Sequence, residues 1–268
     1  MKFSIITVNY NHREGLIKTI QSVINQTYTD YEYIIIDGGS TDGSVEVIKE
    51  YSDRITYWVS ERDKGIYNGM NKGILKAHGE YINFMNSGDT FFDEKTLSMV
   101  NHLMNNNDII VGKDHNEDPK SHKTFQTILP KRISMVTFYL QTFPHQSTFI
   151  RRHLFYGSLY DETLKIVSDW KFFMNKVVYE NASVQILQFP ICNREQGGLS
   201  AFASKTLEER NQVLKNSLPV GILKDYQTLN YLDRSTIYKL FDLIEKKNAR
   251  KVLTLFIKIA NIFYGNNQ

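Results

Sequence analysis

Polar and acidic residues follow four short apolar runs in the first third of this 268-residue sequence. They read Asn9-Tyr10-Asn11, Asp37-Gly38-Gly39-Ser40, Glu61-Arg62-Asp63 and Asn86-Ser87-Gly88-Asp89. Ligands of open parallel sheets bind at the carboxyl ends of the strands, so we expect these groups to converge on one rim. Each segment alone is explained better by turn chemistry, because Asp, Asn, Gly and Ser favour turns for local reasons. Four such segments on one edge favour a binding site.

Asp89 is the residue of this rim best suited to bind a metal. It follows Gly88, where backbone can approach a ligand closely, and a carboxylate is an oxygen ligand that Mg²⁺ or Mn²⁺ accepts. A cation that holds a diphosphate is one interpretation, and a purely structural turn is the other. The known phosphate loops do not fit, because Ser44-Val45 follows Gly43 where a Walker loop needs Lys, and the Gly38-Gly39 pair lacks the dinucleotide-binding spacing. No zincin or serine-hydrolase motif occurs either.

Alternating strands and helices must position this rim. Apolar runs predict strands over residues 3–8, 31–36, 55–59, 81–85 and 108–111. Helical spacing predicts a helix carrying Ile17 to Ile24, a second that Ser40 or Thr41 caps, and a third over residues 67–77. This order predicts an α/β fold with a mostly parallel sheet and helices on both faces.

The composition of the chain changes after residue 112, because all 5 prolines lie beyond it. We therefore predict a first half over residues 1–112 and a second half of the same domain over 113–204. The second half mixes an edge strand before Pro130, strands over 147–150 and 184–189, and a helix over 170–178. Residues 205–268 are predicted to be a helical extension.

Composition excludes several classes of protein. Lys plus Arg number 32 against 29 acids, which is not the strong basic excess of a nucleic-acid-binding chain. Cys192 is the only cysteine, so an intramolecular disulfide is impossible and a reducing, cytoplasmic compartment is expected. The N-terminal run is expected to be a buried strand rather than a signal peptide, and no uncharged apolar run approaches the roughly 20 residues of a membrane span.

Several ordered motifs carry a resemblance to a known family. The runs Ser4–Asn11, Ser22–Tyr28 and Ile35–Gly43 resemble the opening of family 2 glycosyltransferases. The runs Asp63–Gly73 and Gly79–Asp89 are similar to a subgroup associated with bacterial surface polysaccharides such as capsule or lipopolysaccharide O-antigen. The resemblance is close over residues 3–93, looser near residues 144–147 and 168–170, and absent from the C-terminal helices.

The resemblance implies a GT-A fold, in which a half that binds a UDP- or GDP-linked sugar precedes a half that binds a glycan or lipid-linked acceptor. It implies a divalent metal, Mn or Mg, on Asp89 and a catalytic role for Asp169. The nucleotide-sugar contacts that it implies are Val8, Tyr10, Asp37, Asp63, Lys64, Asn71, Lys72, Asn86, Ser87 and Gly88. This chain departs from the family where many relatives have a second Asp at Gly38 and an Arg at Met70. Of the metal-binding D-x-D element, only Asp89 is acidic.

The implied reaction is inverting transfer of a sugar to a hydroxyl group. A non-catalytic nucleotide- or carbohydrate-binding module and a sugar nucleotidylyltransferase are the alternatives. From the residues alone, Ser168 or Asp169 would cap the helix that follows. His145 is predicted either to contact acceptor or diphosphate or to pack with its ring bonded to backbone. Residues 194–200 form either a lid over the donor or an ordinary connection.

The C-terminal segment combines apolar and basic residues. After Glu245 there is no acid, while Lys246, Lys247, Arg250, Lys251 and Lys258 surround a largely apolar run over residues 252–263. This pattern fits a helix lying on the anionic inner face of the cytoplasmic membrane. Packing on the core or on a second subunit of a homodimer is the alternative.

Overall fold

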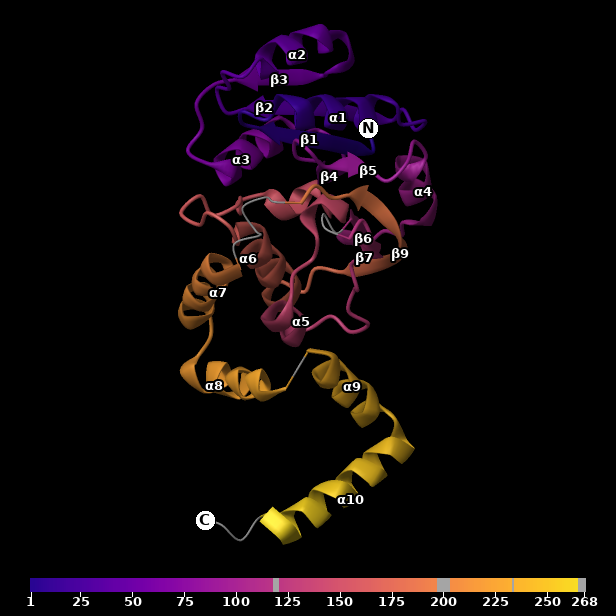
Figure 1. Cartoon of the computed structure of the whole chain (residues 1–268), viewed down its shortest axis with the longest axis vertical. Helices are drawn as coiled ribbons and strands as arrows, with labels where there is room; N and C mark the ends of the chain where they lie inside the picture. Colours follow the sequence, from indigo (N-terminus) through magenta and orange to yellow (C-terminus); the bar gives the residue numbers. More distant parts are fainter. Residues whose placement is uncertain (118–120, 197–202, 233, 265–268) are drawn as a thin grey trace. The chain divides into compact units, whose positions relative to one another are not determined.

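The computed structural model describes residues 1–117, 121–196, 203–232 and 234–264 (Figure 1). They divide into two compact units, Met1–Val213 and Leu214–Gln268. The first unit contains one nine-stranded sheet with the order β3-β2-β1-β4-β8-β6-β9-β5, and β7 pairs with β6 outside this path. All residues predicted to form the site lie in the first unit.

Four parallel strands form the N-terminal part of the sheet. They are β1 (Phe3–Asn9), β2 (Tyr31–Asp37), β3 (Tyr57–Ser60) and β4 (Tyr81–Phe84). Asp37 pairs in register with Asn9 on one side and Ser60 on the other. The polar strand ends therefore share one rim, as the sequence predicts.

Helices cover both faces of these strands. Ile5 and Ile35 belong to one core cluster with residues of α1 (Arg13–Ile24) and α2 (Ser44–Glu50). The alternate residues, Ile6 among them, meet α3 (Ile66–Lys76), where a Cβ on Gly73 would lie only 2.5 Å from Ile6 Cγ2. Both faces of β1, β2 and β4 are buried, so these strands consist mostly of apolar residues, whereas β3 at the edge is only partly buried.

The second half continues the same sheet. The strands β6 (Ile109–Glu117), β8 (Thr148–Arg151) and β9 (Val184–Asn193) are its main members, and β8 runs antiparallel to both β4 and β6. Two short strands add further antiparallel pairs: β7 (Thr124–Gln126) pairs with β6, and β5 (Thr90–Phe91), which comes from the first half, pairs with β9. The predicted α/β fold class is confirmed. The predicted halves 1–112 and 113–204 meet inside β6.

The remaining elements are short helices of the first unit and the helices of the C-terminal segment. The first unit has α4 (Thr96–Leu103), α5 (Met135–Leu140), α6 (Ser168–Met174), the π-helix Asn175–Tyr179 and the 3₁₀ turns Ser52–Arg54, His145–Ser147 and Arg152–Phe155. Towards the C-terminus follow α7 (Ala203–Ser217), α8 (Val220–Thr228), the 3₁₀ turn Leu229–Tyr231, α9 (Arg234–Glu245) and α10 (Lys247–Tyr264). Among the described residues, no helix is both long enough and apolar enough to cross a membrane.

Two predicted helix caps were wrong. The residue at the N-cap of α2 is Gly43, with φ +92°, and neither Ser40 nor Thr41 caps this helix. The Ser40 hydroxyl instead donates to Asp37 Oδ1 at 2.6 Å, so the buried carboxylate takes the hydroxyl that was expected at the helix. The N-cap of α6 is Val167, which places Asp169 inside the first turn.

Candidate active site

The turn after β2 is built around Asp37. Its carboxylate is fully buried and accepts hydrogen bonds from the side chains of Asn9 (2.7 Å), Ser40 (2.6 Å) and Ser60 (2.6 Å) and from the Ser40 amide (2.9 Å). Burial raises the pKa of Asp37, but these hydrogen bonds outweigh burial and hold the pKa below its usual value. Asp37 thus shapes the rim, and a contact with a nucleoside stays a prediction.

Three predicted nucleotide contacts lie beside Gly38 or Gly69. A Cβ on Gly38 would lie 2.7 Å from Asp63 Oδ2 and 3.2 Å from Tyr10 Cδ2, and a Cβ on the nearby Gly69 would lie 2.8 Å from Val8 Cγ1. Tyr10 is 64% exposed, which is unusual for an aromatic residue at the end of a buried strand. The carboxylate of Asp63 therefore lies where a side chain at position 38 would otherwise project.

Polar residues of the run Asp63–Gly73, which leads into α3, are bound mostly to other parts of the chain. Asn71 is buried and exchanges hydrogen bonds with the backbone of Tyr160, at 2.9 and 3.0 Å. Lys72 pairs with Glu61 at 2.7 Å, and Lys64 is exposed. Contacts of Lys64, Asn71 or Lys72 with a nucleotide sugar stay predictions.

The turn after β4 is held in place by the strands and α1. Ser87 Oγ donates to Asn9 Oδ1 at 2.8 Å, and Thr19 Oγ1 accepts from the Gly88 amide at 3.0 Å. Gly88 has φ +100°, a conformation that favours glycine, and the turn carries Asp89. Asp89 Oδ1 accepts the Glu195 amide at 2.9 Å, and burial raises the pKa of Asp89 to about 6.

Asp169 lies in the first turn of α6, between two hydrogen-bond donors. Tyr67 Oη donates to its Oδ1 at 2.9 Å, and His145 Nδ1 lies 3.1 Å from its Oδ2. Burial raises the pKa of Asp169, but the hydrogen bond and charge of His145 together with the Tyr67 hydroxyl outweigh it, so the pKa lies below its usual value. Asp169 is therefore an ionised carboxylate at neutral pH.

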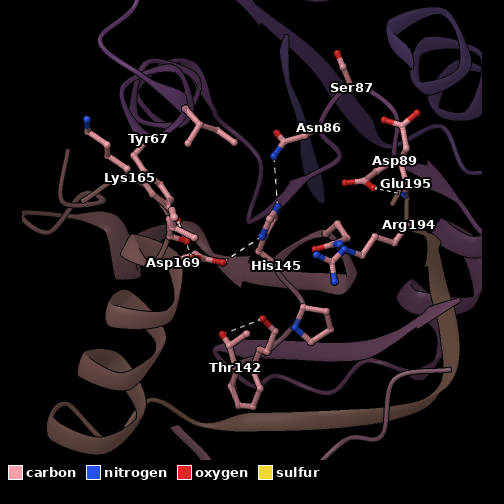
Figure 2. Close-up of a pocket in the computed structure, with 15 residues that line it drawn as sticks. Tyr67, Asn86, Ser87, Asp89, Thr142, His145, Lys165, Asp169, Arg194 and Glu195 are labelled. Atoms are coloured by element: carbon pink, nitrogen blue, oxygen red, sulfur yellow. Dashed lines mark hydrogen bonds and ion pairs between the residues drawn. The ribbon is translucent and has the colours of Figure 1, made fainter. Parts of the chain in front are cut away.

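His145 stands between Asp169 and the turn that carries Asp89 (Figure 2). Its Nε2 lies 3.3 Å from Asn86 Nδ2. Burial lowers the pKa of His145, but the hydrogen bond and charge of Asp169, with the charge of Asp89, outweigh it and raise the pKa. The ring is thus bonded to two side chains rather than to backbone.

One cavity of about 260 Å³ brings the two principal acids together. Asp89 and Asp169 both line it, on either side of His145 (Figure 2). Its other polar lining residues are Tyr67, Asn86, Ser87, Thr142, Gln146, Lys165, Arg194 and Glu195. Gly88 and the predicted contacts Val8, Tyr10, Asp37, Asp63, Lys64, Asn71 and Lys72 are not part of its lining.

Several residues of the site were missed by the sequence reasoning. The sequence assigns no role to Tyr67, although the Asp169 carboxylate and the Ile166 carbonyl share its single hydroxyl proton, the carbonyl at 2.7 Å. Arg194 and Glu195, from the segment predicted to be a lid or a connection, line the cavity, whereas residues 197–202 lie outside the described residues. The sequence contains no pattern that predicts the contact of Tyr67 with Asp169, because 102 positions separate them and only the fold brings them together.

Two neighbouring side chains of α7 hold the segment that leads into α6. The Glu209 carboxylate accepts the backbone amides of Lys165, Ile166 and Val167 at 2.7, 2.8 and 3.0 Å. The neighbouring Arg210 stacks on the ring of Trp170, with its guanidinium carbon 4.8 Å from the ring centroid. Asp169 therefore sits in a helix turn that is held on both sides.

The sequence of this chain matches a known protein family. The profile of Glycosyl transferase family 2 matches residues 4–174. The chain belongs to this family. Its family 2 region contains both Asp89 and Asp169, and the resemblance seen in the sequence is confirmed.

Individual relatives and solved structures agree with this membership. The putative teichuronic acid biosynthesis glycosyltransferase TuaG of Bacillus subtilis is 32% identical over 104 residues, which are 38% of this chain and 41% of TuaG. S. aureus TarS in complex with UDP-GlcNAc shares the fold with a TM-score of 0.61 at 18% identity, over 82% of this chain and 68% of the TarS chain. The mannosyltransferase PcManGT of Pyrobaculum calidifontis, in complex with GDP-Man and Mn²⁺, gives a TM-score of 0.61 at 12% identity, over 99% of this chain and 88% of that one.

These likenesses confirm the GT-A fold of this family 2 chain. For three further curated relatives, the chain covers only 34%, 34% and 17% of their own length. The activity and substrates of the whole protein are therefore proposed below.

The residues of this family 2 site fit a divalent cation through one carboxylate. Asp89 is a desolvated acid whose raised pKa reflects a negative charge that the protein compensates poorly, and a cation would compensate it. Within the described ranges, no group of three or more His, Cys, Asp or Glu side chains could hold a metal by itself. Any cation on Asp89 would therefore take most of its ligands from a diphosphate and water.

Proposed function

We propose that this glycosyltransferase moves a sugar from a nucleoside-diphosphate sugar to a hydroxyl group of a glycan or lipid-linked acceptor, with inversion at the anomeric carbon. The observation that carries the proposal is that Asp89 and Asp169 line one cavity, on either side of His145. A diphosphate near Asp89 leaves the sugar between the two carboxylates. An acceptor hydroxyl near Asp169 then attacks from the side opposite the leaving group, which is the geometry of a single displacement.

The protein's own part in the chemistry is to take a proton and to hold the reactants. The acceptor oxygen forms a bond to the anomeric carbon while the bond from that carbon to the diphosphate oxygen breaks, and the nucleoside diphosphate leaves with the electron pair. Asp169 takes the proton of the acceptor hydroxyl. General-base assistance of this kind contributes roughly 10²- to 10⁴-fold. A cation bound at Asp89 would supply Lewis-acid stabilisation of the negative charge on the leaving diphosphate.

The nucleoside end of the donor is proposed to lie against Tyr10. Its exposed ring offers a stacking face for a base, and the Asp63 carboxylate beside Gly38 offers an acceptor for base N–H groups. Both uracil and guanine present such N–H groups, so UDP- and GDP-linked sugars are both candidate donors. TarS and PcManGT were solved with UDP-GlcNAc and GDP-Man, which supports this choice of donors.

The acceptor is proposed to belong to bacterial surface polysaccharide synthesis. The similarity to TuaG, which is named as a putative teichuronic acid biosynthesis glycosyltransferase, supports this class of product. The residues that would meet an acceptor include Lys165, which is exposed and lines the cavity on the side of Asp169.

Donor turnover tests the proposed function. We expect slow hydrolysis of one nucleotide sugar from a UDP- and GDP-linked panel when the purified protein is incubated with Mn²⁺, because water can replace the acceptor. The measurement is release of nucleoside diphosphate. Release of pyrophosphate from a nucleoside triphosphate and a sugar phosphate would instead identify a nucleotidylyltransferase. Binding of donors without turnover, also with glycan and lipid-linked acceptors present, would identify a binding module.

The C-terminal helices are proposed to bind an anionic membrane surface where lipid-linked acceptors are found. Val252, Leu255, Phe256 and Ile257 on α10 are between 53% and 65% exposed. The same helix carries Arg250, Lys251 and Lys258 and no acid. Exposed apolar side chains beside basic ones are typical of helices that lie in the interface of anionic bilayers.

Charge reversal on α10 tests the membrane proposal. The triple variant Arg250→Glu, Lys251→Glu, Lys258→Glu is expected to bind phosphatidylserine-containing vesicles at least about 100-fold more weakly, because each basic residue near such a surface contributes about 1 kcal/mol. Flotation of the full-length protein with vesicles measures the bound fraction.

The matched control reverses three exposed lysines of the first unit, with Lys18→Glu, Lys49→Glu and Lys95→Glu. This control should float like the wild type although its net charge changes equally. If both variants float like the wild type, the membrane proposal is wrong, and sedimentation would then show whether the C-terminal helices join two copies.

A further inference from the structure

His145 connects the two ends of the cavity through its two ring nitrogens. One nitrogen faces Asp169 Oδ2 at 3.1 Å and the other faces Asn86 Nδ2 at 3.3 Å (Figure 2). Asn86 belongs to the turn that carries Asp89. Among the described residues, no other side chain forms hydrogen bonds to both this turn and Asp169.

The partners of the ring decide its tautomer. Asn86 Oδ1 accepts the Val8 amide at 3.4 Å, so the Asn86 side chain presents its NH₂ group to His145. In the neutral ring, Nε2 must then be the accepting nitrogen, and the proton is on Nδ1, where the Asp169 carboxylate can accept it. Both neighbours assign the same tautomer independently, as the network requires.

The same contacts fix the orientation of the Asp169 carboxylate. Its Oδ1 accepts from Tyr67 on α3 and its Oδ2 from His145 before β8, so donors from two separate elements hold its plane. The Asp169 side chain is 12% exposed and that of His145 is 24% exposed, so the remaining opening lies toward the cavity that both residues line.

We propose that His145 is a positioning residue for the transfer reaction: its Nδ1–H holds the carboxylate of Asp169 in the orientation that receives the acceptor proton, and its Nε2 is anchored on Asn86. This inference rests on the proposed function. It differs from a role in which His145 itself takes the proton, because the proton of the acceptor ends on Asp169 and His145 keeps its own. A misplacement of about 1 Å of a catalytic group costs roughly 100-fold in rate, which sets the expected size of the effect.

Two conservative variants separate positioning from proton transfer. The side-chain nitrogen of Asn reaches about where His Nδ1 lies, so His145→Asn retains a donor to Asp169. The nitrogen of Gln reaches about where Nε2 lies, so His145→Gln loses this donor. We expect His145→Asn to keep most of the wild-type kcat, and His145→Gln to lose roughly 100-fold in kcat with an unchanged Kd for nucleoside diphosphate.

The same pair of changes at His153 is the control. His153 Nε2 lies 3.6 Å from Asp108 Oδ1 outside the cavity, so His153→Asn and His153→Gln should leave kcat unchanged. An equal and large loss of kcat in His145→Asn and His145→Gln would overturn the proposal in favour of His145 as the base. Unchanged kcat in both, or a loss that only follows a lowered melting temperature, would overturn it as well.

A measurement without substrate keeps this inference separate from the transfer reaction. We expect the ¹⁵N shifts of the His145 ring, recorded at a pH where the ring is neutral, to show the Nδ1–H tautomer in the wild type and to show a weaker preference for it in Asp169→Ala, where only Asn86 still favours this tautomer. A wild-type ring with the proton on Nε2 would overturn the proposal even if a donor is turned over. If no donor is turned over, the proposed function fails and the ¹⁵N shifts alone decide whether His145 holds Asp169.

Discussion

Asp169→Asn is expected to lower kcat by roughly 10²- to 10⁴-fold while the affinity for nucleoside diphosphate stays within about twofold of wild type, because the amide cannot accept a proton in general-base catalysis. The change is nearly isosteric, and Oδ1 can still accept the Tyr67 hydroxyl. Steady-state transfer assays together with calorimetric titration of the nucleoside diphosphate measure the two quantities.

The control for this prediction is Asp161→Asn. Asp161 lies in the loop before α6 and pairs with Lys171 of α6 at 2.7 Å, but it does not line the cavity. It should lower the melting temperature without a comparable loss of kcat. Wild-type turnover in Asp169→Asn would contradict the assigned role, and an equal loss of kcat in both variants would show that only the stability of this segment matters.

The stability of Asp169→Asn should depend on pH in a defined direction. The pKa of Asp169 is lower in the folded protein than in the unfolded chain, where it has the ordinary value, because His145 and Tyr67 outweigh the effect of burial. Its ionisation therefore stabilises the fold above the ordinary pKa, and this stabilisation is lost as the pH falls through the lower, folded pKa. The variant should unfold more readily than the wild type at neutral pH, and the difference should shrink in acid.

The parallel strands and their rim could be predicted because local rules determine them. Both faces of β1 and β2 are buried, so their residues read as apolar runs, and the register that aligns Asn9 with Asp37 follows from two strands that end together. The antiparallel strand β5 could not be predicted, because two residues carry no periodicity and its partner Cys192 is distant in the sequence.

Local rules also explain the wrong cap at Ser40. Ser, Thr, Asp and Asn favour helix N-caps and turns for the same reason, which is a short side chain that bonds nearby backbone. The sequence does not reveal that the Asp37 carboxylate, buried by the sheet, competes for the Ser40 hydroxyl. Because the sheet buries the Asp37 carboxylate, the Ser40 hydroxyl bonds to it and does not cap α2.

The candidate site divides in the same way. Asp89 and Asp169 were identified from motifs, but the side chains that tune them come from elsewhere in the chain. His145 precedes Asp169 by 24 positions, and neither its contact with Asp169 nor its orientation leaves a periodic trace in the sequence. Similarly, the sequence does not reveal that Asn71 bonds the Tyr160 backbone, which it does because a buried amide needs partners wherever the fold places it, and its contact with the donor stays a prediction.

Asp89→Asn is expected to have the second large effect, with the opposite consequence for stability. The amide keeps an oxygen that can accept the Glu195 amide but has no charge to hold a cation. We expect kcat/KM to fall by at least about 100-fold, since Lewis-acid stabilisation of a leaving group contributes several kcal/mol. The tightening of nucleoside diphosphate binding by Mn²⁺, measured by calorimetry with and without the metal, should disappear.

Burial raises the pKa of Asp89 to about 6, above its ordinary value. Without a cation, ionisation of Asp89 therefore destabilises the folded protein once the pH exceeds the ordinary pKa, and this destabilisation is complete above about pH 6. Asp89→Asn should therefore be at least as stable as the wild type at pH 8 in a chelating buffer, although it is inactive.

The matched control is Asp114→Asn, at a buried acid that accepts the Ser147 hydroxyl at 2.7 Å outside the cavity, and it should retain the response to Mn²⁺. A variant at Asp89 that still binds nucleoside diphosphate more tightly with Mn²⁺ would show that the cation is held elsewhere. If Asp89→Asn loses activity only because it unfolds, Asp89 is a structural turn residue. A carboxylate that serves only to bind a cation should instead destabilise the folded protein when no cation is bound.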